Sequence, residues 1–159
     1  MKKSFCLVAL ALAASQASAR DLYWQPIAAL AGGDADYARQ TLTGEFGDDP
    51  GQWPDWIDPV GLYVPTRRDR LLVVRRPAHE PCGQYRYVVY GTVTPDLRRD
   101  RLGEFCGGGL QVTMVPDLDW PDLQIDESRF SDADGNWRRK DQRLRYRDGQ
   151  WWLVLGGGS

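Results

Sequence analysis

The dipeptide Asp148-Gly149, near the end of the chain, restricts the fold more than any other local feature. It lies between two runs with strand character, residues 142–147 and 150–155. An Asp-Gly pair in this setting is the strongest short-range hairpin signal, because a type I′ turn needs positive φ at both central residues. The sequence therefore predicts that the chain ends in a β-hairpin.

Four earlier runs also have strand character. Residues 61–64 and 70–74 are short and apolar, and the polar stretch between them predicts another hairpin. Residues 85–90 combine aromatic and β-branched side chains, which favour strands over helices. Residues 110–115 alternate apolar with polar side chains, as in a strand with one buried face.

The N-terminal part of the chain has a different pattern. Residues 25–42 fit two short amphipathic helical turns that are broken at Gly32-Gly33, with Asp34 as the cap of the second. An irregular stretch follows, in which Trp53 and Trp56 can fold back over the core. The predicted fold class is α+β and mostly β: an antiparallel sheet or small sandwich with a short N-terminal helical segment and one disulfide.

The first nineteen residues have the pattern of a secretory signal peptide. Lys2 and Lys3 precede a short apolar run, and residues 17–19 read Ala-Ser-Ala, a typical cleavage site. The apolar run is shorter than the roughly 20 residues that cross a bilayer. We expect residues 1–19 to be a signal peptide, residues 20–159 to form a single exported globular domain, and the protein to be periplasmic. Cys6 is then a hydrophobic residue of the leader rather than a lipid attachment site.

Two cysteines, Cys82 and Cys106, remain in the expected mature chain. In an oxidising compartment, two cysteines in a small domain are typical of a disulfide. The alternatives are a metal site and a nucleophilic thiol. Zinc needs three or four ligands, and His79 with Cys82 offers two at a close spacing, while a nucleophile would compete with the bridge. We expect the disulfide, and no metal or cofactor.

Two other motifs bear on chemistry. Gly107-Gly108-Gly109 lacks the following helix of a phosphate-binding loop, so it predicts a flexible turn into a strand. Residues 132–137 begin like an EF-hand loop, but Trp137 occupies its sixth position and Arg143 its twelfth, where glycine and glutamate belong. A polar turn is the simpler interpretation, and partial calcium binding is the alternative.

The remaining enzymatic hypothesis is a pair of carboxylates. Five acids in a proline-containing stretch could supply a glycosidase-like pair, although a solvated surface explains them more simply: Asp117, Asp119, Asp122, Asp126 and Glu127. The chain has one histidine and no G-x-S-x-G motif. Acids and arginines alternate along the chain and the net charge is −2, which argues against nucleic-acid binding.

A rigid β frame with aromatic and arginine-rich loops is typical of a protein-binding module. The candidate contact residues lie in three loops and in the stretch around Trp120. They are Arg98, Arg99, Arg101, Gly107, Gly108, Gly109, Trp120, Asp132, Asp134, Asn136 and Trp137.

The closing stretch RLRYRDGQWWLVL, residues 143–155, resembles the terminal hairpin of small exported bacterial β proteins. These include periplasmic lysozyme inhibitors and immunity proteins against secreted cell-wall hydrolases. The resemblance implies a partner of that class, a secreted peptidoglycan hydrolase whose active-site cleft is plugged by a loop. The alternatives are a structural or accessory envelope protein with another protein partner and, third, a small hydrolase that uses loop carboxylates.

Overall fold

The computed structural model describes residues 19–64, 69–92, 99–115 and 120–155. Ten strands form one sheet: β1 (Ala19–Asp21), β2 (Trp24–Gln25), β3 (Val60–Tyr63), β4 (Leu71–Pro77), β5 (Tyr85–Thr92), β6 (Arg99–Gly107), β7 (Leu110–Thr113), β8 (Asp122–Ser131), β9 (Trp137–Arg147) and β10 (Gln150–Leu153). The helical elements are α1 (Gly32–Phe46) and three 3₁₀ turns, η1 (Ile27–Ala29), η2 (Pro50–Gln52) and η3 (Asp55–Ile57). The predicted class, mostly β with an N-terminal helix and a disulfide, is confirmed.

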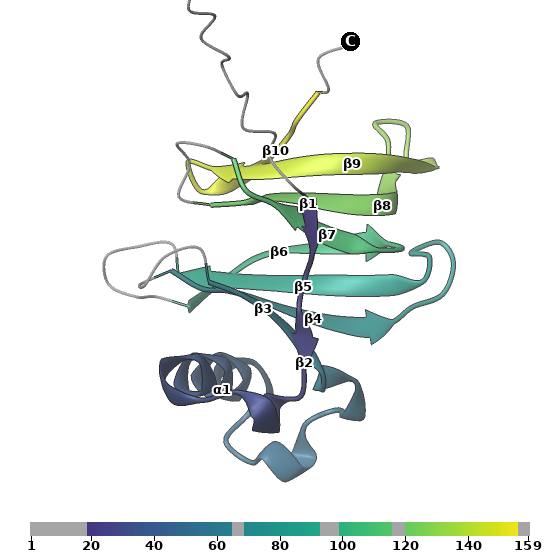
Figure 1. Cartoon of the computed structure of the whole chain (residues 1–159). Helices are drawn as coiled ribbons and strands as arrows, with labels where there is room; N and C mark the ends of the chain where they lie inside the picture. Colours follow the sequence, from purple (N-terminus) through teal and green to yellow (C-terminus); the bar gives the residue numbers. More distant parts are fainter. Residues whose placement is uncertain (1–18, 65–68, 93–98, 116–119, 156–159) are drawn as a thin grey trace, which may run out of the picture.

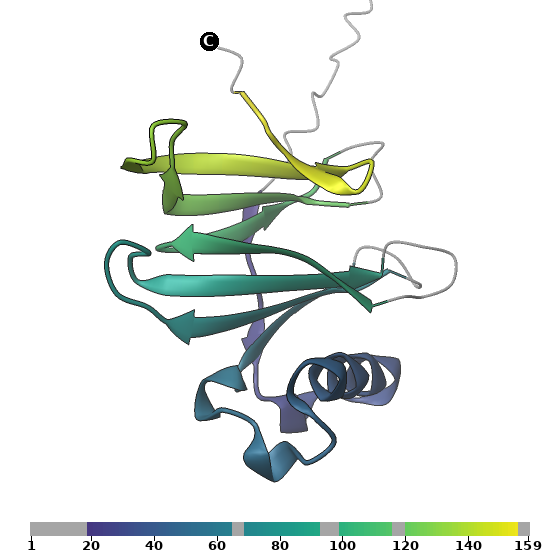
Figure 2. The same ribbon diagram turned by 180° about the vertical axis from the view of Figure 1, so that it is seen from behind.

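All strand pairs are antiparallel, in the order β1-β7-β8-β6-β5-β4-β3-β2, with β9 on β8 and β10 on β9. The two ends of this order, β1 and β2, follow one another in the chain, with only Leu22 and Tyr23 between them. The N-terminal segment therefore runs across the sheet and joins its two ends (Figure 1). Figure 2 shows the same arrangement from behind, with α1 at the end of the molecule opposite β9 and β10.

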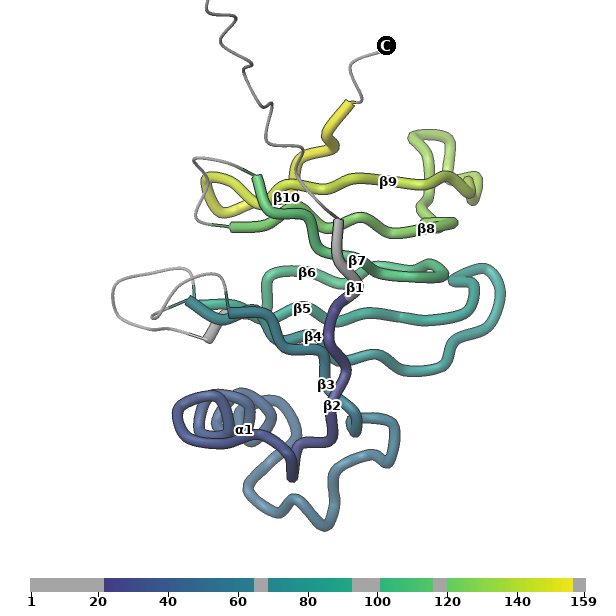
Figure 3. Tube along the Cα trace, viewed as in Figure 1, coloured from purple at the N-terminus to yellow at the C-terminus, as the bar shows by residue number. Residues whose placement is uncertain are grey.

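β6 and β7 are one bent strand rather than a strand and a loop. Cys106 pairs with Arg129 and Leu110 with Ile125, so both halves keep the same register on β8. The amide of Gly108 donates to the carbonyl oxygen of Asp126 at 2.8 Å. A Cβ on Gly107 would meet Ile125 Cγ2 at 2.5 Å, so β8 can approach this closely only because the residue is glycine. The chain does bend into its next strand at residues 107–109, as predicted, and hydrogen bonds to Asp126 hold the bend against β8 (Figure 3).

β4 is buried on both faces and separates two hydrophobic clusters. Leu71 and Val73 pack into the first, which lies inside the curled sheet and includes side chains from β5, β7, β8 and β9. Leu72 and Val74 pack into the second, between the sheet and α1. A continuous apolar run, instead of an alternating one, is the pattern of a strand covered on both sides.

The helix differs from its prediction. α1 is a single helix that begins at Gly32, and its N-cap, Ala31, makes no side-chain cap hydrogen bond. Asp34 does not cap it, because its carboxylate accepts a hydrogen bond from Arg70 Nε at 2.7 Å. Tyr37, Ala38 and Leu42 are buried against the sheet, and this packing overrides the low helix propensity of the two glycines.

The predicted disulfide and the predicted turn at Asp148-Gly149 are both confirmed. Cys82 and Cys106 form a disulfide that ties the turn before β5 to the end of β6. Asp148 and Gly149 have φ of 54° and 80°, as a type I′ turn requires, and join β9 to β10. Among the described residues, no helix has the length and apolar character to cross a membrane.

Replacing both cysteines by alanine should lower the free energy of unfolding by about 3 kcal/mol, because the bridge closes a loop with a sequence separation of 24. Urea unfolding of the purified protein measures the change. A reducing agent should destabilise the wild type to a similar extent and leave the double variant unchanged. Equal stability of the two proteins without reductant would contradict the assignment.

Candidate functional site

The structure separates the candidate contact residues. Trp120, one of them, packs against the core, and a Cβ on Gly91 would meet its ring at 2.8 Å.

The arginines and glycines lie along β6 and its bend. Arg99 begins β6, Arg101 lies within it, and Gly107 is buried at the bend. Arg98 lies outside the described residues. Gly108 and Gly109 lie against Asp126 of β8. Arg99 and Arg101, which were predicted to lie in a loop, therefore belong to a strand.

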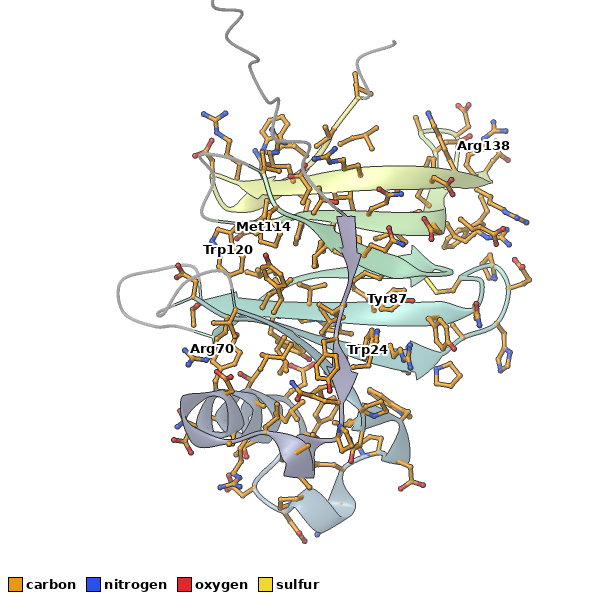
Figure 4. The ribbon with its side chains drawn as sticks, in the orientation of Figure 1. Trp24, Arg70, Tyr87, Met114, Trp120 and Arg138 are labelled. Atoms are coloured by element: carbon orange, nitrogen blue, oxygen red, sulfur yellow. A yellow bond between two sulfur atoms is a disulfide. The ribbon has the colours of Figure 1, made fainter. Side chains whose placement is uncertain are left out.

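Asp132, Asp134, Asn136 and Trp137 do come together, at the turn of the hairpin formed by β8 and β9. Figures 1 and 2 show this turn at one edge of the molecule with no other element over it. Figure 4 places Arg138 beside it, at the same outer edge. We call residues 132–137 the hairpin tip.

The carboxylate of Asp132 organises the hairpin tip. Its Oδ1 accepts hydrogen bonds from the backbone amides of Asp134 at 3.0 Å and Asn136 at 2.9 Å, and its Oδ2 accepts one from Arg138 Nε at 2.6 Å. Gly135, with φ of 80°, provides the left-handed residue of the turn. The Arg138 hydrogen bond first, and the two amides after it, lower the pKa of Asp132 below its ordinary value. The tip is thus held by its own polar groups.

Trp137 is the large apolar side chain of this tip, and 52% of its surface is exposed. It follows the turn directly and pairs with Ser131 across the hairpin. Asp134 and Asn136 are exposed beside it, so an aromatic ring and hydrogen-bonding groups are presented together on a fixed turn. Such a combination is suited to protein recognition.

A β-bulge bends the hairpin halfway along its length. The register between β8 and β9 shifts between Ile125 and Ser128, and Glu127 has a φ of 51°. The bulge is fixed by side chains: Asp141 Oδ1 accepts from the Glu127 amide at 2.8 Å, and Glu127 accepts from Arg139. Bulges of this kind redirect a strand and increase its twist.

The root of the hairpin is held by an ion cluster around one buried carboxylate. The side chain of Asp122 is fully buried and accepts hydrogen bonds from Arg143 Nε at 2.7 Å, Arg145 Nε at 2.8 Å and Arg145 Nη2 at 2.9 Å. The hydrogen bond to Asp122 raises the pKa of Arg145. With its oxygens engaged by two guanidinium groups, Asp122 is a structural residue, which argues against its use in a catalytic carboxylate pair.

The disulfide lies beside this hairpin. Cys106 pairs with Arg129 of β8, and Arg129 Nη2 donates to Glu80 at 3.0 Å, in the same turn as Cys82. The bridge therefore links the hairpin to the turn between β4 and β5, which Figure 1 shows on the same side of the molecule. His79 in that turn is exposed.

Sequence reasoning missed β6 and β8. The acids of residues 122–127 indicated a solvated loop, although Leu123 and Ile125 alternate with polar residues as in a strand. Arg143 and Arg145, two positions apart on β9, point to the same face, and both pair with the buried Asp122. Among the described residues, no three histidine, cysteine or carboxylate side chains are grouped to hold a metal ion.

Removing the charge of Asp122, which pairs with two arginines at the hairpin root, should lower the free energy of unfolding. Asp122→Asn leaves two arginines facing a neutral group, and we expect the free energy of unfolding to fall by about 2 kcal/mol, discounted because both guanidiniums are partly exposed. Asp148→Asn is the matched control, since its ion pair with Arg147 is exposed and asparagine tolerates positive φ. That control should change stability by less than about 0.5 kcal/mol in urea unfolding.

The hairpin tip should show a specific pH dependence. Because the folded-state pKa of Asp132 is lowered, its contribution to the order of the tip is present above the ordinary pKa of 3.8 and is lost as the pH falls through the lowered value. NMR titration of the Asp132 carboxyl carbon should give a midpoint below 3.8. In Arg138→Gln the midpoint should move up towards the ordinary value, and an unchanged midpoint would contradict the assigned cause.

Three comparisons with known proteins found no relative of this chain. No family model, no curated protein and no solved structure matches the chain.

Proposed function

We propose that the protein is an exported inhibitor or immunity-type protein that inserts the hairpin tip into the active-site cleft of a secreted enzyme. The observation that carries the proposal is the exposed Trp137 on a turn that the hydrogen bonds of Asp132 already fix. A projecting, convex tip is complementary in shape to a concave cleft, and occupation of the cleft excludes the substrate.

The rigidity of the hairpin supports this role. Binding by a flexible loop costs conformational entropy, and a loop that is already ordered avoids much of this cost. Ion pairs at the root, polar contacts at the bulge and the carboxylate of Asp132 at the tip all restrict the hairpin before any partner binds. Tryptophan is also among the residues most enriched at binding hot spots.

The class of enzyme comes from the resemblance of residues 143–155 to the terminal hairpin of periplasmic lysozyme inhibitors and immunity proteins. These residues form the end of β9 and all of β10, so they belong to the same sheet that carries the hairpin tip. We therefore propose a secreted peptidoglycan hydrolase as the partner and the periplasm as the place of action.

One observation favours a second candidate, an accessory envelope protein that binds a different partner. Trp152, Leu153 and Leu155 are exposed on or just after β10, which pairs on one side with β9. This apolar edge lies away from the hairpin tip along β9. Substitutions at the two surfaces therefore distinguish the two functions.

Trp137→Ala should weaken inhibition of the partner hydrolase by at least about 30-fold, the effect of losing a hot-spot contact of about 2 kcal/mol. The measurement is the inhibition constant of the purified protein against peptidoglycan hydrolases that the source cell secretes or encounters. The partner itself is first identified by copurification with the tagged wild-type protein.

Trp152→Ala is the matched control, because Trp152 is exposed to the same 52% but lies on β10. It should leave the inhibition constant within a factor of about two. If Trp152→Ala lost binding and Trp137→Ala kept it, the accessory function would be favoured. Absence of binding to any peptidoglycan hydrolase would sink the inhibitor proposal.

A further inference from the structure

A hollow lies away from the hairpin tip, between the end of α1, η3 and the face of β4, β5 and β6. It has a volume of about 200 Å³. Its floor is formed by Val74 and Val88, and its aromatic wall by Phe46 and Trp56, whose rings meet edge to face at 5.7 Å. Its rim carries three arginines and two glutamates: Arg76, Arg86, Arg101, Glu45 and Glu104. We call it the arginine hollow.

The hydroxyl of Tyr90 in this hollow is buried, and its contact with the Glu45 carboxylate does not reach the geometry of a hydrogen bond. Tyr90 is 3% exposed, lines the hollow, and its oxygen has no hydrogen-bond partner of acceptable geometry among the described residues, although the Glu45 carboxylate lies nearby. A buried polar group in this state is costly, and in native proteins it requires an explanation. Burial first, and Glu45 second, raise the pKa of Tyr90, so the phenol stays protonated and able to donate.

The charges of the arginine hollow are also incompletely paired. Arg86 donates to Glu104 at 2.8 Å, and Arg101 donates to Glu45 at 3.2 Å and also to Glu104. Arg76 has no carboxylate partner in the part of the chain that the structure describes, and its guanidinium lies 5.9 Å from the centre of the Trp56 ring. It stands directly opposite Arg86 across β4 and β5. Two like charges in this position repel each other, and among the described residues only Arg86 of the two has a carboxylate beside it, Glu104.

We propose that the arginine hollow binds a small organic acid, with its carboxylate at Arg76 and Arg86, its flat apolar body on the valine floor beside Trp56, and a second polar group at the Tyr90 hydroxyl. Guanidinium groups bind carboxylates with well-directed hydrogen bonds. The hollow is smaller than the sites that take drug-sized ligands, so the ligand is a small molecule with one ring or a short chain. The hollow and the hairpin tip share no residue, so this site is independent of the proposed inhibition.

The test uses 4-hydroxybenzoate, benzoate and succinate as probes, with 4-hydroxybenzamide as the uncharged counterpart. Binding to the folded protein is followed by NMR signals of Trp56 and Tyr90 and by the melting temperature, up to about 10 mM because ligands of this size bind weakly. We expect at least one carboxylate to bind at least about tenfold more tightly than the amide, since only the acid pairs with the arginines.

Two variants test the residues separately. Arg76→Gln should weaken carboxylate binding at least about tenfold, whereas Arg147→Gln, an exposed arginine of β9, should not change it. Tyr90→Phe should raise the melting temperature of the ligand-free protein by a few degrees, because it removes a buried unsatisfied hydroxyl, and should weaken the hydroxyl-bearing probe more than benzoate.

Three outcomes would overturn the proposal. They are no response of Trp56 and Tyr90 to any of the carboxylates, equal binding of acid and amide, and unchanged binding in Arg76→Gln. A loss of stability in Tyr90→Phe would show that the hydroxyl has a structural partner, which would also count against the site.

Discussion

The bent strand from β6 to β7 is the constraint on which the rest of the structure depends. One edge of it pairs first with β5 and then with β1, and the other edge pairs with β8. The bend requires that β8 pass within contact distance of Gly107, and Tyr87 fixes it from the inside by donating a hydrogen bond to the Gly108 carbonyl. Because β8 carries the hairpin tip and β5 carries Tyr90, both candidate sites take their positions from this one strand.

The sequence allowed several of these elements to be predicted, where the signal was local. The Asp148-Gly149 turn depends on two φ angles, the run at β4 on burial of both faces, and the cysteine pair on the compartment. The first two can be recognised within a few residues, and the third follows from the two cysteines that remain after the expected signal peptide. β6 and β8 were missed for a physical reason: their polar side chains have partners that are far away in the chain, such as Glu45 for Arg101 of β6 and Glu80 for Arg129 of β8. When the partner of a charged residue is distant in the chain, a single sequence does not distinguish that residue from one exposed to solvent.

The same limit applied to the candidate sites. The hairpin tip was located because its turn residues are contiguous, although the role of Asp132 is to hydrogen-bond its own backbone rather than to bind a cation. The arginine hollow gave no signal, because its residues come from α1, η3 and three strands. Only the pairing of Arg76 with Arg86 and the packing of α1 against the sheet bring these side chains together.

The crossing of the sheet by the N-terminal segment has a consequence for the order of folding. β3, β4, β5 and β6 pair with their immediate neighbours in the chain, and so do β8, β9 and β10, so these contacts form after the closure of short loops. β1 must instead wait for β7, which is made after more than half of the chain has been synthesised. We therefore expect the seam between β1 and β7 to close last during folding and to open first under denaturing conditions.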